Sequence, residues 1–362
     1  MSALELDVIV PVHDAHRRVD RLAASVLDGT GTPLRLTFVC HGIPVADIRA
    51  AVGEHADDPR VRFIGFSDGI RSPTGPFRAG LAAATAPYVM KIDSDDALEP
   101  GALDAWMRLR RRAGAAIVIC RMRSATATQD WPTPPSRPLR RHRMSPLRDR
   151  LSYRTSTMGI IARDLMLQSP PVVGLPTGED IESGLGLWFS GRPIALASRE
   201  PAYLVHDDAG ERATSPRPVA DEFAWLPSLT ESPLIASLDT RARATIATKL
   251  VRVQLFGALT ARAASLSAED IAMLRDAASM LVRLADGVPP WLSRADRDVL
   301  DALTDPSADT ASLAPLLARR RQFGHPATLL PRQLRWTLHR ESPLRVMTAS
   351  LLAARRRTRV RR

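Results

Sequence analysis

Short apolar runs alternate with amphipathic stretches over the first 120 residues of the chain. Runs rich in β-branched residues predict strands at 6–12, 34–40, 61–66, 88–93 and 115–120. Between them, apolar positions at helical spacing predict helices at 14–28, 43–56, 77–86 and 100–112. Strands that alternate with helices in this way predict an α/β fold with a mostly parallel central sheet flanked by helices.

The pattern changes at two places further along the chain. Residues 124–150 mix prolines with arginines and predict an irregular loop, followed by a helix at about 181–190 and short strands within 193–198 and 201–208. From about residue 215, alanine, leucine and arginine recur at helical spacing over 234–265, 268–285 and 294–304. We therefore expect an α/β domain at 1–215, an all-α domain at 216–328 and a basic amphipathic tail at 329–362.

The composition is that of a globular protein with a sizeable core. Apolar residues make up 45% of the chain and charged residues 25%. No apolar run is long enough for a membrane-spanning helix, and the acidic N-terminal start does not fit a secretory signal. The two cysteines, Cys40 and Cys120, each lie in an apolar run, so we expect buried thiols and no zinc site or disulfide. A cytoplasmic location fits this pattern.

The net charge of +11 comes almost entirely from arginine, because lysine occurs only at Lys91 and Lys249. Arginines cluster at 108–112, 137–150 and 355–362. Such clusters suit an anionic surface, either a phosphate polymer or acidic lipid. A basic scaffold that binds nucleic acid is an alternative interpretation, but aromatic residues are only 5% and no nucleic-acid-binding motif is recognised, so we expect no nucleic-acid partner.

The strongest chemical signal is Asp93-Ser94-Asp95-Asp96, which follows the predicted strand at 88–93. Open α/β sheets bind ligands at the carboxyl ends of their strands. Neighbouring carboxylates there can share a divalent ion and a ribose, and their hard oxygen atoms suit Mg²⁺ or Mn²⁺. In the alternative interpretation, Asp96 is the N-cap of a helix. The chain has neither a P-loop motif nor G-x-G-x-x-G after a strand, which disfavours both nucleotide folds.

Two further polar groups lie beyond the irregular loop. Gly178-Glu179-Asp180 stands just before the predicted helix at 181–190, where the helix dipole alone would favour acidic residues. His206 follows a predicted strand, and a single histidine is more often a structural residue than a ligand. Asp207 and Asp208 beside it are equally compatible with a polar turn.

Taken in order, these motifs resemble the family-2 glycosyltransferases with a GT-A fold. The resemblance covers about residues 6–215 and begins at Val8-Ile9-Val10-Pro11-Val12-His13-Asp14. It continues through residues 79–89 and is most specific at Asp93-Ser94-Asp95-Asp96-Ala97-Leu98-Glu99-Pro100. Gly178-Glu179-Asp180 matches the acidic motif on the acceptor side, and His206 falls where many members place a further metal ligand.

The resemblance implies an inverting, metal-dependent transfer of a sugar from a nucleotide-diphosphate donor to a hydroxyl group. It implies a divalent ion, Mn²⁺ or Mg²⁺, bound by Asp95 and His206, and a general base at Asp180 supported by Glu179. The nucleotide-sugar pocket would include Pro11, Val12, Asp14, His41, Arg78, Asp93 and Ser94. The metal would offset charge on the leaving diphosphate, and the base would take the proton of the acceptor hydroxyl.

The sequence departs from the family on the nucleotide side. Members usually carry Asp-Asp-Gly-Ser after the second strand, where this chain has Cys40-His41-Gly42-Ile43, and an Arg-Asn pair where it has Phe77-Arg78. The identity of the nucleobase is therefore left open, with UDP as the default nucleotide. We hypothesise that His41 or Arg78 replaces the missing contacts. The same departures support the alternative that the chain is a non-catalytic GT-A-like module that binds a nucleotide sugar or acts as a scaffold.

The layout, a glycosyltransferase domain followed by helices, is similar to that of enzymes that decorate wall teichoic acids. It implies a glycan, glycopolymer or lipid-linked acceptor of the cell envelope. The arginines at 137–150 are either a site for a phosphate-bearing acceptor or a solvated loop. The tail at 329–362 mixes leucines with arginines and could lie on an anionic membrane or pack on a partner helix, so a peripheral position on the inner face of the membrane is a further expectation.

Overall fold

The computed structural model describes residues 3–126, 136–137, 140–207, 217–263, 265–307 and 309–359, with backbone alone from 353 onwards. The described residues form two compact units. The first, the N-terminal unit, comprises Met1–Thr133, Leu139–Pro146 and Arg154–Ser215, and the second, the helical unit, comprises Pro134–Pro138, Leu147–Tyr153 and Pro216–Arg362. Contacts thus group the described parts of the 147–153 segment and the tail with the C-terminal helices. The division into domains at 1–215, 216–328 and 329–362 stays a prediction.

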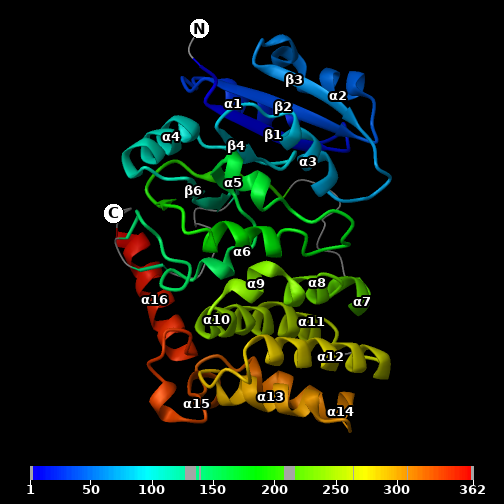
Figure 1. Cartoon of the computed structure of the whole chain (residues 1–362), viewed down its shortest axis with the longest axis vertical. Helices are drawn as coiled ribbons and strands as arrows, with labels where there is room; N and C mark the ends of the chain where they lie inside the picture. Colours follow the sequence, from blue (N-terminus) through cyan, green and yellow to red (C-terminus); the bar gives the residue numbers. More distant parts are fainter. Residues whose placement is uncertain are drawn as a thin grey trace. The chain divides into compact units, whose positions relative to one another are not determined.

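A seven-stranded sheet forms the centre of the N-terminal unit (Figure 1). Its order is β3-β2-β1-β4-β8-β6-β9, and β8 alone of the seven runs antiparallel to its neighbours. The strands are β1 (Leu6–Val12), β2 (Leu34–His41), β3 (Val61–Phe66), β4 (Tyr88–Lys91), β6 (Ile117–Cys120), β8 (Gly159–Ala162) and β9 (Ile194–Ala197). Because β2, β1 and β4 are parallel neighbours, their carboxyl ends meet at one edge of the sheet.

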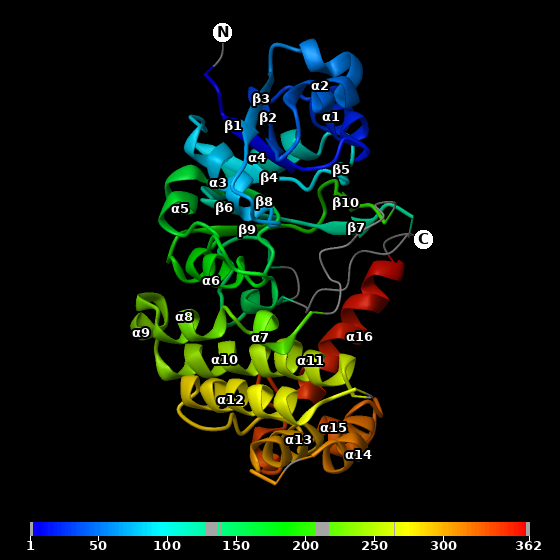
Figure 2. The same cartoon turned by 90° about the vertical axis from the view of Figure 1, so that its right-hand side faces the viewer.

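Helices cover both faces of this sheet, as expected for the α/β fold (Figure 2). The side chains of α1 (Val19–Leu27), α2 (Val45–Val52) and α4 (Ala102–Ala113) share one buried core with every second residue of β1. A short 3₁₀ turn, η1 (Gly53–Asp57), follows α2. On the other face, α3 (Thr74–Ala82) approaches β1 so closely that a Cβ at Gly80 would lie 2.5 Å from Ile9 Cγ2. Only glycine permits this contact.

Asp7, the second residue of β1, fixes the approach to β4. Its fully buried carboxylate accepts hydrogen bonds from Arg35 Nε at 2.7 Å and Arg35 Nη2 at 3.1 Å. It also accepts the backbone N–H groups of Thr85 at 2.7 Å and Ala86 at 2.8 Å. Burial acts to raise the pKa of Asp7, but these donors outweigh it and hold the pKa below its ordinary value. The start of β4 is therefore tied to β1 and β2 through one charged group.

A second sheet has three strands. It contains residues 97–98, which follow β4 closely in the sequence, and Tyr203, which belongs to the candidate site described below. Its order is β5-β10-β7, with β5 (Ala97–Leu98), β10 (Tyr203–Val205) and β7 (Met122–Ser124). The remaining elements of this unit are α5 (Arg163–Gln168) and α6 (Ile181–Phe189). The strands expected within 193–198 and 201–208 are confirmed as β9 and β10, whereas the sequence analysis did not predict β5, β7 or β8. In the described part of the expected loop, residues 140–150 contain no helix or strand.

The described part of the helical unit consists of short helices and five longer ones, of which the first four have side-chain caps. Its elements are η2 (Leu151–Tyr153), α7 (Val219–Glu222), α8 (Leu226–Glu231), α9 (Pro233–Ser237), α10 (Thr240–Leu250), η3 (Val251–Leu255), α11 (Phe256–Ala261), α12 (Ala268–Leu284), α13 (Arg294–Thr304), α14 (Thr310–Arg320), α15 (Pro326–Leu329), η4 (Leu334–Trp336) and α16 (Pro343–Arg359). Asp239, Ser267, Ser293 and Asp309 cap the starts of α10, α12, α13 and α14. Of the described helices, none has the length and apolar character needed to cross a membrane.

Charged side chains are buried inside the helical unit around Glu341, which is 1% exposed. Glu341 Oε1 lies 3.7 Å from Arg150 Nε, and the Tyr153 hydroxyl donates to Glu341 Oε2 at 3.5 Å. The Arg252 guanidinium donates to the backbone carbonyl of Glu341 at 2.7 Å. These contacts hold the 147–153 segment against the chain that leads into α16.

Candidate active site

The acidic turn, Asp93 to Asp96, lies where β1 and β4 end side by side. The backbone N–H of Ile92 donates to the Ile9 carbonyl at 3.1 Å, so the pairing of β4 with β1 continues up to the turn. Ser94 and Asp96 are buried, at 6% and 5% exposed, whereas Asp93 and Asp95 are partly exposed. The turn therefore presents Asp93 and Asp95 to solvent at the edge where ligands bind in such sheets.

Asp96 is the structural anchor of this turn. Its carboxylate accepts a hydrogen bond from the Tyr203 hydroxyl at 2.7 Å and from the backbone N–H of His206 at 2.9 Å. The same hydroxyl accepts the backbone N–H of Asp93 at 3.1 Å. Burial raises the pKa of Asp96 to about 7, although these two donors act to lower it. The interpretation of Asp96 as a helix N-cap is wrong, because β5 follows it and α4 begins only after Gly101.

Both partly exposed carboxylates of the turn have cationic partners. Asp95 forms an ion pair with the Arg17 guanidinium, whose side chain is 14% exposed, and Arg21 Nη2 donates to the Asp95 carbonyl at 2.5 Å. Asp93 Oδ1 lies 2.9 Å from Lys91 Nζ. Arg17 and Arg21 come from the start of α1 and the loop before it, which the β1–β4 pairing brings next to the turn.

The acceptor-side motif stands at the start of α6. Gly178 has a φ of +74°, which glycine adopts without strain, and Asp180 is the N-cap residue of α6. The Asp180 side chain makes no capping hydrogen bond to the helix, so a capping role does not explain it. Burial acts to lower the pKa of Lys91, but Asp93, and then Asp180 and Glu179, outweigh it and raise that pKa. One ammonium group is thus within electrostatic range of both acidic motifs.

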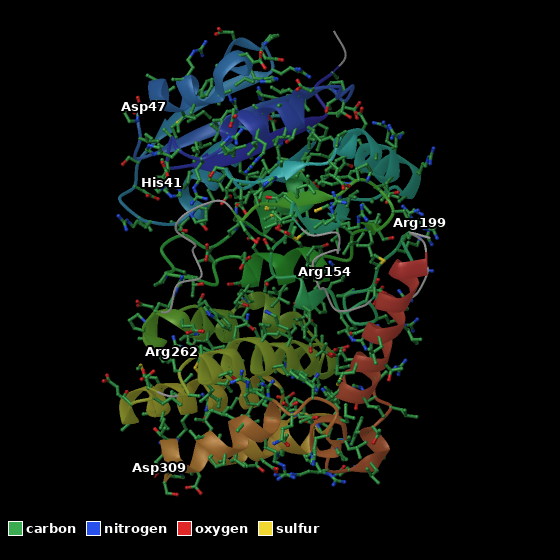
Figure 3. All side chains as sticks on the ribbon, turned by 180° about the vertical axis from the view of Figure 1, so that it is seen from behind. His41, Asp47, Arg154, Arg199, Arg262 and Asp309 are labelled. Carbon is green, nitrogen blue, oxygen red and sulfur yellow. The ribbon has the colours of Figure 1, made fainter. Side chains whose placement is uncertain are left out.

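His41 (Figure 3) ends β2, and its ring contacts the Asp68 carboxylate. His41 Nε2 lies 2.8 Å from Asp68 Oδ1, and Asp68 also accepts the backbone N–H of Ile70 at 2.9 Å. Beside this pair is a shallow pocket of about 500 Å³ lined by Cys40, Gly42, Ile43, Pro44, Gly65, Phe66 and Ser67. The pocket continues the sheet edge at the carboxyl ends of β2 and β3, and the apolar ring of Phe66 offers a surface for stacking.

The other residues predicted for the nucleotide side lie on several elements of the N-terminal unit. Pro11 and Val12 are buried at the end of β1, so their side chains belong to the core. Asp14 accepts hydrogen bonds from the backbone N–H and the ring of His16, chiefly the backbone one, which lower its pKa. Arg78 is exposed on α3. His206 reaches the acidic turn through its backbone N–H.

The side chains around the acidic turn can be compared with the ligands that a divalent cation needs. Among the residues that the structure describes, no three His, Cys, Asp or Glu side chains are gathered closely enough to hold a metal ion. Asp93 and Asp95 offer hard oxygen donors, and each is already neutralised by a cationic side chain. Mg²⁺ is commonly held by one or two carboxylates together with substrate phosphates. A cation at this turn would therefore need further ligands from a bound diphosphate.

The arginines at 137–150 are largely engaged within their own units. Arg137 donates to Asp149 at 2.7 Å, Arg141 pairs with Glu200, and Arg150 contacts Glu341. In the 108–112 cluster, Arg110 lies over the Tyr88 ring, 4.5 Å from its centroid. These arginines contact other side chains of the fold, whereas a solvated charged loop would leave them in water.

Sequence reasoning missed four residues of this site: Arg17, Arg21, Lys91 and Tyr203. The partners of Asp95 and Asp96 stand 78 and 107 positions away in the chain, so no local pattern signals them. Lys91 carried a weak signal, since it is one of two lysines in the sequence and directly precedes the turn.

Comparison with known proteins finds a family match for the first part of the chain. Residues 7–168 match the family described as Glycosyl transferase family 2. The structure resembles that of S. aureus TarS 1–349 in complex with UDP-GlcNAc, with a TM-score of 0.71 and 16% identity over 88% of this chain and 92% of that one. For the same fragment in complex with UDP, the TM-score is 0.68 at 15% identity, with 88% and 92% covered. No curated protein sequence matches the chain.

At this level of identity the structural likeness shows the fold, and it extends into the helical region because it covers most of both chains. The mostly parallel sheet flanked by helices is the GT-A fold that the sequence predicted. The chain therefore carries a family-2 glycosyltransferase domain of the GT-A fold, followed by a helical region, and is a glycosyltransferase.

Proposed function

We propose that this glycosyltransferase moves a sugar from a nucleoside-diphosphate donor to an acceptor hydroxyl at the carboxyl ends of β1, β2 and β4. The observation that carries the proposal is the position of Lys91. Its ammonium contacts Asp93 on the donor side and is within electrostatic range of Glu179 and Asp180 at the start of α6. Donor-side and acceptor-side acids therefore surround one small region, as a displacement with two reactants requires.

The chemistry follows from the two groups of acids. The bond between the anomeric carbon and the diphosphate oxygen breaks, and its electron pair leaves with the nucleoside diphosphate. The acceptor hydroxyl oxygen forms the new bond to the anomeric carbon, and its proton passes to the Asp180 carboxylate. A hydroxyl is a poor nucleophile at neutral pH, so this base accounts for a large part of the rate. Attack from the face opposite the leaving group inverts the anomeric carbon.

The nucleotide fits the edge between β1 and β3. The pocket beside β2 offers Phe66, Ile43 and Pro44 as an apolar surface for the base, and the His41–Asp68 pair offers a polar group at its rim. UDP is the nucleotide we propose, and the UDP and UDP-GlcNAc complexes of S. aureus TarS support this choice. Backbone groups of Pro11 and Val12 would approach the nucleotide from the end of β1, with Asp14 after this strand and Arg78 on α3 as the further contacts that we propose.

We propose that a divalent ion, Mn²⁺ or Mg²⁺, takes part through Asp95, with His206 as a second ligand. The ion supplies charge neutralisation for the leaving diphosphate. Two structural features support Asp95: its oxygen donors and its position in a turn held in place by Asp96 and Arg21. Binding through few protein ligands makes the donor diphosphate part of the site.

The acceptor that we propose is a glycan, glycopolymer or lipid-linked sugar of the cell envelope, reached from the cytoplasmic face of the membrane. Support comes from α16, which exposes Leu351 and Leu352 and leads into the arginines at 355–362. Basic helices of this kind lie on anionic lipid surfaces. Deleting residues 353–362 is expected to reduce pelleting of the protein with anionic vesicles, and unchanged pelleting would remove the membrane from the proposal.

Thermal stability of the full chain with nucleotides tests the donor site. A ligand that binds only the folded protein raises the melting temperature by mass action. We expect one nucleoside diphosphate of a UDP, GDP, ADP and CDP panel to stabilise the protein in the presence of Mn²⁺, and Asp95→Asn to lose this shift. Asp20→Asn, on the exposed face of α1, is the control and should keep it. If no nucleotide shifts the wild type, a non-catalytic GT-A-like module becomes the better description.

A further inference from the structure

The Arg17–Asp95 ion pair occupies the carboxylate that the proposed function assigns to the cation. Both side chains are mostly shielded from water, at 14% and 22% exposed. Arg17 lies in the loop before α1, and Asp95 lies 78 positions later in the acidic turn. The neighbouring Arg18 is different, because it pairs with Asp20 on the surface, where both side chains are about half exposed.

A guanidinium group and a divalent cation compete for this carboxylate. Both need the same oxygen atoms, and their positive charges repel each other at short range. A cation that binds Asp95 in the absence of donor separates the mostly buried Arg17 from this carboxylate, which is costly. When a nucleoside diphosphate binds as well, its phosphate oxygens give Arg17 a new anionic partner of suitable geometry.

We propose that Arg17 is an exchangeable counter-ion that holds Asp95 until the cation and the donor diphosphate bind together. This inference rests on the proposed function and assigns a role to a residue outside the family motifs. Arg17 keeps the acidic turn neutralised in the free enzyme and transfers to the diphosphate when the cation takes Asp95. Binding of the cation and binding of the nucleotide therefore strengthen each other, and the coupling is reciprocal.

The rest of the site allows this exchange without rearranging the turn. Arg21 binds the backbone carbonyl of Asp95, so the turn stays attached to α1 when Arg17 leaves. Asp96 holds the turn from the other side through Tyr203 and the His206 backbone. Lys91 neutralises Asp93 independently, so the exchange concerns Asp95 alone.

The coupling can be measured directly as Mn²⁺ affinity, from the electron paramagnetic resonance signal of free Mn²⁺, with and without UDP. For the wild type we expect weak Mn²⁺ binding alone and at least fivefold tighter binding with UDP, since couplings between sites are typically ~5–150-fold. Arg17→Gln should bind Mn²⁺ alone about tenfold more tightly than the wild type and show a smaller coupling, which comes only from the ligands that the diphosphate supplies to the cation. Arg18→Gln is the matched control and should behave as the wild type.

Arg17→Lys provides a second variant that keeps the charge and is expected to retain weak binding of Mn²⁺ alone. The proposal is overturned if UDP tightens Mn²⁺ binding equally in the wild type and in Arg17→Gln, or if Arg17→Gln and Arg18→Gln bind Mn²⁺ alone equally. The proposed function fails in a different way, namely when neither the wild type nor any variant binds UDP in the presence or absence of Mn²⁺. That outcome would overturn the counter-ion role as well.

Discussion

Tyr203→Phe tests whether the buried hydrogen bonds behind the acidic turn hold it in place. The Tyr203 hydroxyl donates to Asp96 Oδ2 at 2.7 Å and accepts the Asp93 backbone N–H at 3.1 Å, and the Tyr203 side chain is fully buried. Phenylalanine fills the same space, so the variant leaves no cavity and removes only the two bonds. Leaving a buried polar group unpaired costs about 1–3 kcal/mol.

The expected loss lies in the lower half of the combined range of about 2–6 kcal/mol for the two groups. Asp96 is almost fully buried and should cost about 2 kcal/mol, and the Asp93 N–H, beside a partly exposed side chain, about 1 kcal/mol. The sum of ~3 kcal/mol corresponds to ~100-fold faster hydrogen exchange of amides in β4 and β10, if these open together. Exchange followed by mass spectrometry reports on this unit separately from the helical unit.

The pH dependence gives a second readout. The pKa of Asp96 is raised to about 7, above its value in the unfolded chain, so the protonated carboxyl favours the folded state. The stability from this group is complete at acid pH and falls as pH rises through about 7. Tyr203 stabilises the ionised carboxylate, so its loss should cost more at pH 8 than at pH 6.

Tyr88→Phe is the matched control for this experiment. It removes one hydroxyl, which accepts a hydrogen bond from Arg110 Nη1 at 2.7 Å, while the stacking of the guanidinium on the ring remains. We expect a loss of ~1 kcal/mol or less, since a single hydrogen bond contributes about that much. If Tyr203→Phe accelerates exchange no more than Tyr88→Phe, Tyr203 does not hold the turn and the reasoning is refuted.

Two further predictions concern the sheet that positions the site. Asp7→Asn removes the buried partner of Arg35 and should cost ~3 kcal/mol at pH 7 in urea unfolding. Because the pKa of Asp7 is lowered in the fold, its contribution is present above the unfolded pKa and lost toward acid pH, so an equal loss at pH 7 and pH 3 would contradict the assignment. Gly159→Ala places a Cβ 2.0 Å from the Val118 carbonyl oxygen at a φ of +138° and should lower the melting temperature by ~6 °C or more. Gly191→Ala, with a φ of +74° and open space, should lower it by less than half as much.

Much of the fold can be predicted from the sequence where the apolar positions of an element repeat regularly from its first residue to its last. The strands at 6–12 and 61–66 and the helix at 294–304 are confirmed to the residue as β1, β3 and α13. The helix expected from residue 14 begins only at Val19. Asp14 and Arg17 are engaged instead with His16 and Asp95, and these contacts favour a loop over another helical turn.

The elements that escaped prediction depend on distant partners. β8 has four residues, and its place between β4 and β6 comes from pairing with both of them in an antiparallel register. β5 has two residues and exists because β10 pairs with it from more than 100 positions away. Short strands of this kind have too few positions for a period of two to appear, so tertiary contacts decide them.

The candidate site also has parts that a local sequence pattern predicts and parts that depend on distant residues. The acidic turn and the motif at 178–180 could be found from the sequence because each is a local cluster that follows a strand or precedes a helix. Arg17 could not, since it is an ordinary charged residue until the β1–β4 pairing places it beside the turn, and Lys91, which directly precedes the turn, gave only a weak signal. The roles of Asp180 and His206 stay predictions.

Release of nucleoside diphosphate from a panel of UDP- and GDP-sugars tests the central claim most directly, using water or an added glycan as acceptor. The wild type is expected to release the diphosphate from at least one donor. Asp180→Asn should bind that donor normally and release the diphosphate ~100-fold more slowly or worse, as for loss of a general base. Glu182→Gln, two residues further along in the first turn of α6, should stay within about threefold of the wild type. Equal rates for Asp180→Asn and the wild type, or no release from any donor, would contradict the account.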